Sequence, residues 1–177
     1  MISTKRTLLK LLSVDNAKDL YAYRSLPEVY KYQSWFPKNI SDAEDFIKDY
    51  SSHHDFEVEG WKQFGIFLIE DNTLIGDCGC CIQPDNQAEI GYTISPQYQR
   101  KGLGSEVVES LINFLFRELS LRKIIAKTDP ENIGSIKVLE KFGFRKEAHL
   151  VRSVQIRGEW KDDLVYVILR EDWIKDQ

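Results

Sequence analysis

The spacing of hydrophobic positions divides the chain into short strands and amphipathic helices. In several stretches apolar residues alternate with polar or small ones, which is typical of a strand with one buried face. In others they recur every three or four residues, as on a helix that packs against a sheet. The predicted strands cover residues 7–12, 61–68, 74–82, 88–94, 124–128, 148–156 and 164–169, and the predicted helices run from 13 towards 27, from 41 to 50, from a glycine loop to 119, and from 132 to 143.

Local capping signals and the order of elements predict the fold class. Ser41 with Glu44 has the sequence of a capping box, and Asn132 is suited to cap a helix that ends at Gly143. The order β-α-α-β-β-β-α-β-α-β-β has no repeat and no Pro-, Gly- or Ser-rich linker. We therefore predict a single domain over residues 1–177, of α/β (α+β) class, with one mixed sheet and helices on its faces.

The charge pattern excludes some partners. The formal net charge is -4 and both signs are interspersed, whereas nucleic-acid binding needs a concentrated basic face. No stretch approaches the roughly 18 apolar residues of a membrane helix, and residues 1–6 lack the apolar run of a signal peptide. We expect a cytoplasmic protein that binds neither nucleic acid nor membranes.

The cysteines favour packing over metal binding. Alternation places Cys78 and Cys80 on one face of a strand and Cys81 on the other. A zinc site would need a second pair of ligands, and His53 and His54 are adjacent, without the usual spacing of metal ligands. We interpret the cysteines as small buried thiols and predict no metal site.

The run Ile-Ser-Pro-Gln-Tyr-Gln-Arg-Lys-Gly-Leu-Gly, residues 94–104, joins a predicted strand to a predicted helix. Two glycines after a basic pair let backbone N–H groups approach an anion, and the helix directs its positive end to the same place. A dinucleotide-binding loop needs a third glycine where Val107 stands, and a triphosphate loop needs a lysine where Ser105 stands. The loop is therefore either a pyrophosphate site or a plain turn.

Three features together resemble the GNAT (GCN5-related N-acetyltransferase) superfamily. Gln99-Arg100-Lys101-Gly102-Leu103-Gly104 is similar to its acetyl-CoA pyrophosphate loop, Q/R-x-x-G-x-G/A. Residues 132–144 resemble its asparagine-bearing helix that ends in Gly-Phe, and the order of elements agrees over nearly the whole chain. Residues 88–92 and 158–160 resemble the branch that holds ribosomal-protein N-terminal acetyltransferases and spermidine acetyltransferases.

The resemblance implies a cosubstrate and a mode of binding. The sheet would be mostly antiparallel and splayed where two strands part, so that the pantetheine arm of acetyl-CoA lies between them and the acceptor enters from the opposite side. A backbone N–H near Thr93 or Ile94 would stabilise the oxyanion. Asn132 would contact pantetheine or serve only as a helix cap. The expected cofactor-binding residues are Thr93, Ile94, Gln99, Arg100, Lys101, Gly102, Leu103, Gly104 and Asn132.

Acetyl transfer needs a base, because an amine is mostly protonated at pH 7. Alternation places Glu89 on the same strand face as Gly91 and Thr93, from which it can reach the cleft. The alternative is an exposed carboxylate paired with a lysine or arginine. Many superfamily members protonate the leaving sulfur with a tyrosine, but Leu139 stands at that position. Ser135, one helical turn earlier, resembles the serine of the ribosomal-protein branch and is the candidate donor, with water as the alternative.

The predicted reaction is direct transfer of acetyl from acetyl-CoA to a primary amine, with a protein or peptide N-terminal amine as the first choice. A polyamine or aminoglycoside acceptor and a catalytically silent acyl-CoA-binding module are the alternatives. The aromatic segment 30–36 suits an acceptor wall, although Tyr32, Trp35, Trp61 and Trp160 would each also fit ordinary packing. The sequence leaves a monomer and a homodimer both open.

Overall fold

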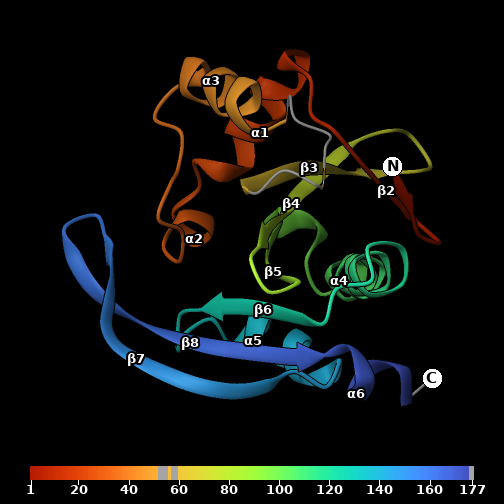
Figure 1. Cartoon of the computed structure of the whole chain (residues 1–177). Helices are drawn as coiled ribbons and strands as arrows, with labels where there is room; N and C mark the ends of the chain where they lie inside the picture. The colour runs from red at the N-terminus through yellow and green to blue at the C-terminus, as the bar shows by residue number, and fades with distance from the viewer. Residues whose placement is uncertain (52–55, 57–59, 176–177) are drawn as a thin grey trace.

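The computed structural model describes residues 1–51, 56 and 60–175, and its strands form one sheet (Figure 1). The strand order is β1-β2-β3-β4-β5-β6-β8-β7. Among the described residues β5 and β6 are parallel, and the other neighbours are antiparallel. This confirms the predicted mixed, mostly antiparallel sheet. The strands are β1 (Ile2–Ser3), β2 (Thr7–Lys10), β3 (Gly60–Leu68), β4 (Leu74–Gln83), β5 (Gln87–Ile94), β6 (Lys123–Thr128), β7 (Arg145–Ile156) and β8 (Glu159–Leu169).

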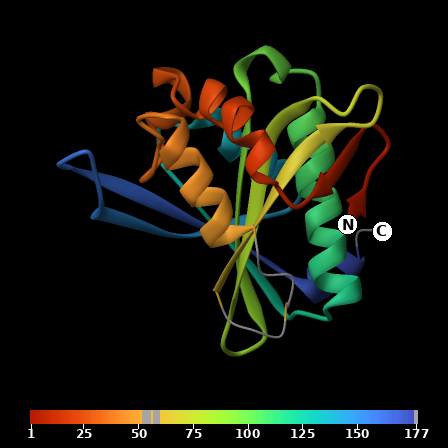
Figure 2. The ribbon, with the colours of Figure 1, turned by 90° about the horizontal axis from the view of Figure 1, so that it is seen from above.

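Helices cover both faces of the sheet (Figure 2). On one face, α1 (Ala17–Arg24) and α3 (Ile40–Tyr50) contact β4 and β3. On the other, α4 (Leu103–Asn113) contacts β5 and α5 (Ile133–Lys141) contacts β6. Each face therefore buries its own core. The other helical segments are η1 (Val14–Asn16), α2 (Pro27–Tyr30), η2 (Pro96–Tyr98), the π-helical turn η3 (Phe114–Glu118) and α6 (Arg170–Lys175).

The parallel neighbours β5 and β6 diverge along their length. Their last pair is Ile90 with Ala126, although β5 continues to Ile94 and β6 to Thr128. On its other edge, β5 stays paired with β4 as far as Ile94. The facing edges of the diverging segments therefore carry backbone groups that no neighbouring strand satisfies, and an extended ligand can add to such an edge. The predicted splay of the sheet is confirmed.

Several predicted boundaries differ from the structure: β2 ends at Lys10 and not at residue 12, and β7 begins at Arg145 and not at residue 148. Two further differences have a clear physical cause. Asn39, and not Ser41, is the N-cap of α3, and its side chain accepts a hydrogen bond from a backbone N–H of the first turn at 3.0 Å. The last strand begins earlier than predicted, at Glu159. It does so because Arg157 and Gly158 both adopt positive φ, 50° and 83°, and close a tight two-residue hairpin.

The cysteines lie as alternation predicts. Cys78 and Cys80 are buried and Cys81 is half-buried, and burial raises the pKa of the Cys80 thiol to about 12. His53 and His54 lie outside the described residues. In the part of the chain that the structure describes, no helix is long and apolar enough to cross a membrane, and no group of three or more potential metal ligands occurs.

Candidate active site

The loop before α4 has the backbone conformation of an anion site. Arg100 and Gly102 adopt positive φ, 59° and 78°, and α4 begins directly afterwards at Leu103, whose side chain is buried. The N–H of Glu106 donates to the Gly102 carbonyl at 3.1 Å and so closes the first helical turn. The N–H groups of residues 103–105 therefore have no acceptor within the helix and are available to an anion at its positive end.

Side-chain contacts fix this loop on the end of β5. Gln99 Nε2 donates to the Ile94 carbonyl at 2.8 Å. A Cβ on Gly104 would lie 3.4 Å from Cγ1 of Ile94, so a larger residue there would press against the strand. Arg100 and Lys101 are exposed, which places their charges at the rim of the loop.

One backbone hydrogen bond shows which amides of β5 face the gap between β5 and β6. The N–H of Ser95 donates to the Ile75 carbonyl of β4 at 2.8 Å. Successive residues of a strand turn their backbone groups to opposite sides. Thr93 therefore faces β4, and Tyr92 and Ile94 face the gap. Of the two amides that the sequence suggests for the oxyanion, the one oriented toward the gap is that of Ile94.

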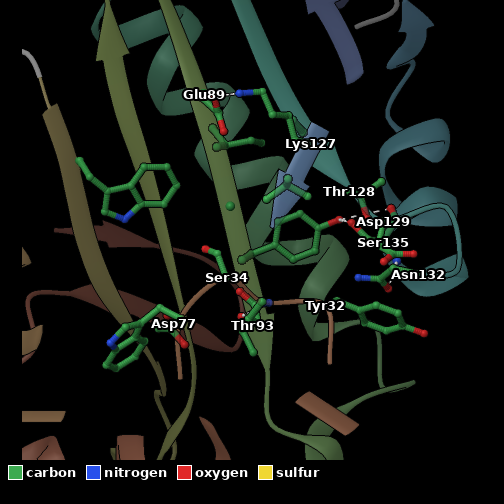
Figure 3. A pocket seen from close by; sticks show the side chains of 18 of the residues that line it. Tyr32, Ser34, Asp77, Glu89, Thr93, Lys127, Thr128, Asp129, Asn132 and Ser135 are labelled. Carbon is green, nitrogen blue, oxygen red and sulfur yellow. Dashed lines mark hydrogen bonds and ion pairs between the residues drawn. The ribbon is translucent and has the colours of Figure 1, made fainter. Parts of the chain in front are cut away.

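A cavity of about 580 Å³ lies along the diverging strands (Figure 3). It continues from the gap to the side where segment 32–35, α3 and β3 lie. Both predicted catalytic residues, Glu89 and Ser135, line it, as do Thr93 and Asn132 among the predicted cofactor residues. The loop residues 99–104 are not part of its lining. The structure thus places Glu89 and Ser135 on one cavity and leaves Ile94 and the phosphate loop outside its lining.

The first turn of α5 carries two predicted site residues. Asn132 is its N-cap, with Oδ1 accepting from the Ser135 N–H at 3.2 Å. The Ser135 hydroxyl lies 3.0 Å from the hydroxyl of Tyr92, which also lines the cavity. Burial raises the pKa of Tyr92 to about 12, against the opposing effect of the Ser135 hydrogen bond. Tyr92 is therefore a protonated donor at neutral pH, although alternation alone assigns it to the core face.

Thr128, at the end of β6, is a site residue that the sequence pattern does not reveal. The residue lines the cavity, and its hydroxyl is buried without a hydrogen-bond partner among the described residues. Leaving a buried hydroxyl unpaired costs free energy, so a ligand group in the gap is its natural partner. Leu139, by contrast, is fully buried in the core and offers the cavity no polar group.

Glu89 lies at the edge of the cavity beside Lys127, as Figure 3 shows, and its Oε2 accepts from Lys127 Nζ at 3.0 Å. Glu89 thus lines the cavity, as a catalytic base must. It is also paired with a lysine, as the alternative interpretation of an ion-paired carboxylate states. Asp129 and Asp163 line the same cavity. Partial burial raises the pKa of Asp163, with Lys127 opposing the shift and Glu89 and Asp129 adding to it. Three carboxylates and one lysine thus line this cavity, a balance that favours a cation.

A buried ion pair forms the wall of the cavity next to α1. Asp77 of β4 is fully buried and accepts from Arg24 Nε at 3.0 Å and from the Tyr23 hydroxyl at 2.5 Å. Arg24 Nη2 and Gln63 Nε2 also donate to its second oxygen. Burial, followed by the charge of Asp77, raises the pKa of Tyr23. The sequence signal for this network is a lone aspartate in a strand of apolar and small residues.

Aromatic rings line the part of the cavity formed by segment 32–35, α3 and β3. Tyr32, Trp35 and Trp61 all contribute to it. Trp35 stacks on Phe46 of α3 with 4.2 Å between the ring centroids, so packing and lining are combined in one residue. Trp160 is 60% exposed on the β7–β8 hairpin and lies outside the lining. Trp160 therefore belongs neither to the buried core nor to the cavity wall.

Sequence comparison connects this geometry to known proteins. Residues 6–145 match the acetyltransferase (GNAT) domain family. The uncharacterized N-acetyltransferase p20 of Bacillus licheniformis is 34% identical over 174 residues, which cover 96% of each protein. The [ribosomal protein uS5]-alanine N-acetyltransferase of Escherichia coli is 31% identical over 113 residues, which cover 62% of this chain and 58% of that protein.

Solved structures show the same fold. A GNAT-family acetyltransferase from Bacillus anthracis superimposes with a TM-score of 0.86 at 29% identity, covering 96% of this chain and 98% of that one. Spermidine N-acetyltransferase from Vibrio cholerae, in complex with CoA and spermine, has a TM-score of 0.80 at 22% identity, covering 95% of this chain and 98% of that one. The second likeness shows the fold alone.

Proposed function

The chain belongs to the GNAT family of N-acetyltransferases, and on that premise we propose that it transfers acetyl directly from acetyl-CoA to the N-terminal amine of a protein or peptide. The observation that carries this proposal is the gap between β5 and β6, which opens into a cavity that continues to the other side of the sheet. Donor and acceptor can enter such a passage from opposite sides and meet. Cys78, Cys80 and Cys81 all lie outside the cavity lining, so no cysteine is placed to carry the acetyl group.

GNAT acetyltransferases use acetyl-CoA, which supplies the acetyl group and a thiolate leaving group when bound, and the described residues fit its parts. The amides of residues 100–104 suit the pyrophosphate, because Gly102 allows the left-handed turn and α4 begins there. The gap edge of β5 suits the extended pantetheine arm. The amides of the pantetheine arm would supply the partner that the unpaired Thr128 hydroxyl lacks. Asn132 caps α5 through Oδ1, which leaves its Nδ2 free to donate.

Proton handling is assigned to side chains of the cavity. Glu89, directly or through water, takes a proton from the ammonium form of the acceptor. The gap-facing N–H of Ile94 stabilises the oxyanion on the thioester carbon. Ser135 and Tyr92 share a hydrogen bond, so either hydroxyl is placed to pass a proton toward the leaving sulfur.

The acceptor is assigned from charge and from one relative. The cavity lining contains three carboxylates, Glu89, Asp129 and Asp163, and one lysine, Lys127. This excess of negative charge suits an acceptor that arrives as an ammonium ion. Among the relatives, the E. coli enzyme named for alanine of ribosomal protein uS5 supports a protein N-terminus. The polyamine alternative fits the same charge pattern, because a polyamine is also a cation.

An acceptor panel tests this function. Thiol release from acetyl-CoA is followed with peptides that begin with alanine or serine, with spermidine and with an aminoglycoside. We expect release well above hydrolysis with at least one of the peptides. Turnover with spermidine alone would replace the peptide assignment by the polyamine one. CoA binding without acceleration by any amine would instead identify a silent acyl-CoA-binding module.

The base is tested by Glu89→Gln. We expect kcat to fall about 100-fold, because an amide does not accept the proton, while CoA affinity stays at the wild-type value. Glu159→Gln is the matched control, since Glu159 forms a similar ion pair with Lys161 at 3.1 Å, away from the cavity. Equal kcat in the Glu89 variant and the control would remove Glu89 from the mechanism.

A further inference from the structure

The N-terminal segment reaches the phosphate loop through Arg6. Arg6 Nη1 donates to the carbonyl of Lys101 at 3.0 Å, although the two residues are 95 positions apart. Its Nε donates to Glu106 Oε2 at 2.8 Å, and its backbone N–H donates to Glu106 Oε1 at 2.6 Å. The Thr4 hydroxyl contacts the same carboxylate. Arg6 therefore joins the strand β2, which it precedes, to both the loop and the first turn of α4.

The bond to Lys101 has a directional consequence for the next amide. The described residues contain no cis peptide bond. In a trans peptide the C=O of one residue and the N–H of the next point in opposite directions. Because Arg6 holds the carbonyl of Lys101, the N–H of Gly102 points to the other side of the loop. Gly102 has a φ of 78°, and amides around such a left-handed residue form a concave anion nest.

Arg6 also balances a charge that would oppose an anion. Glu106 lies in the first turn of α4, where its carboxylate would repel a phosphate. Burial of this carboxyl is outweighed by hydrogen bonds from Thr4 and Arg6, which hold the pKa of Glu106 below its ordinary value. The carboxylate is thus ionised at neutral pH. The guanidinium of Arg6 offsets this negative charge from directly behind the loop. A Cβ added to Gly102 would lie only 3.4 Å from Arg6 Nη2.

We propose that Arg6 is a positioning residue of the cofactor site, which holds the Lys101 carbonyl and neutralises Glu106 so that the loop amides are oriented before the pyrophosphate arrives. The inference rests on the proposed use of acetyl-CoA. Arg6 acts from behind the loop and not as a ligand. Its side chain is 45% exposed, and exposed ion pairs contribute little to folding. Its effect is therefore on the loop more than on the stability of the fold.

The test compares acetyl donors that carry a pyrophosphate with one that lacks it. In Arg6→Gln the affinity for CoA, measured by calorimetry, is expected to fall about tenfold, the usual scale for a lost charge-assisted hydrogen bond. The kcat/KM for S-acetylpantetheine, which lacks the pyrophosphate, is expected to equal that of the wild type. Arg6→Lys should recover only part of the CoA affinity, since an ammonium lacks the planar fork that joins the carbonyl to the carboxylate.

Arg145→Gln is the matched control, because it removes the same charge from another exposed ion pair, with Asp172 at 3.4 Å. It should bind CoA as the wild type does. Equal CoA affinity in Arg6→Gln and the wild type would overturn the inference, and so would an equal loss with S-acetylpantetheine, which would indicate a general structural effect. A wild type that binds no CoA would overturn the proposed function, and the inference with it.

Discussion

The proposed donor side, which would take acetyl-CoA, and the proposed acceptor side of the cavity region are built from different kinds of group. The donor side is made of backbone: the amides of residues 100–104 and the gap-facing edge of β5, held in place by a left-handed Gly102 and the start of α4. The acceptor side is made of side chains from α1, segment 32–35, α3, β3 and β4, with the Asp77–Arg24 pair as its buried support. A site made of backbone groups is specified by a few consecutive residues, whereas a wall made of side chains is formed by residues far apart in the sequence. The donor side can therefore be read from one short stretch of sequence, whereas the acceptor side becomes visible only in the folded chain.

The largest expected effect concerns the acceptor wall. Asp77→Asn leaves Arg24, 7% exposed, without a counter-charge. Removing one partner of a buried ion pair costs about 3–5 kcal/mol. Urea unfolding measures this loss in the free energy of unfolding, and CoA affinity measured on the folded protein should be unchanged if the two sides are independent.

Asp45→Asn is the control for this change. Asp45 forms an exposed pair with Lys48, and its removal should alter the free energy of unfolding by less than about 0.5 kcal/mol. If Asp77→Asn were as mild as the control, the buried pair would not be the support of the wall.

The next effect concerns the donor loop. In Gly102→Val a β-branched side chain is forced to a φ of 78°, and its Cβ would lie 3.4 Å from Arg6 Nη2. The loop backbone must shift to relieve this strain, so CoA affinity should fall about 100-fold. Gly158→Val carries similar strain at a φ of 83°, in a hairpin with nothing within 4 Å of the added Cβ. Calorimetry should show wild-type CoA binding for the Gly158 variant, and wild-type binding by both variants would contradict the donor site.

A smaller effect is expected where the two sides meet. Tyr92→Phe and Ser135→Ala should each lower kcat about tenfold, because a thiolate leaves readily and needs only modest help from a donor. The double variant should be little worse than either single one, since the two hydroxyls act as one hydrogen-bonded unit. Tyr166→Phe, whose hydroxyl bonds Glu140 at 3.0 Å outside the cavity lining, should keep kcat. Unchanged kcat in all variants would leave water as the donor.

The smallest effect is a pH dependence of folding at Glu106. Its pKa in the folded chain lies below the ordinary value of 4.5, so the unfolded chain takes up the proton first as pH falls. The stabilisation is fully present above pH 4.5 and is lost as pH falls through the lowered pKa. Urea unfolding of the wild type and Glu106→Gln should therefore differ by less than about 1 kcal/mol at pH 7 and converge in acid. A difference that grew in acid would contradict this.

The sequence predicts the position and conformation of the glycine loop well, for a physical reason. A glycine loop between a strand and a helix is a local pattern, and the structure gives that loop the positive φ at Gly102 and places the splay beside it. Asn132 is likewise read from its position before a helix, and it does cap α5. Elements without a local period are missed, such as the two-residue β1 and the short α2 and α6.

The residues that the sequence does not reveal depend on contacts between distant segments. Asp77 meets Arg24 from 53 positions away, and Tyr92 meets Ser135 from 43 positions away. Arg6 precedes a strand with no motif, and its role is visible only once the loop lies against it. Side-chain alternation finds the face on which such residues lie, but the partner on that face is set by the fold.

A crystal structure of the chain with CoA tests the central claim most directly. The account predicts phosphate oxygens at about 2.7–3.2 Å from the amides of residues 100–104. It also predicts that the pantetheine arm pairs with the backbone of Tyr92 or Ile94 along the gap. CoA bound elsewhere, or a complex in which β5 and β6 are paired to their ends, would contradict it.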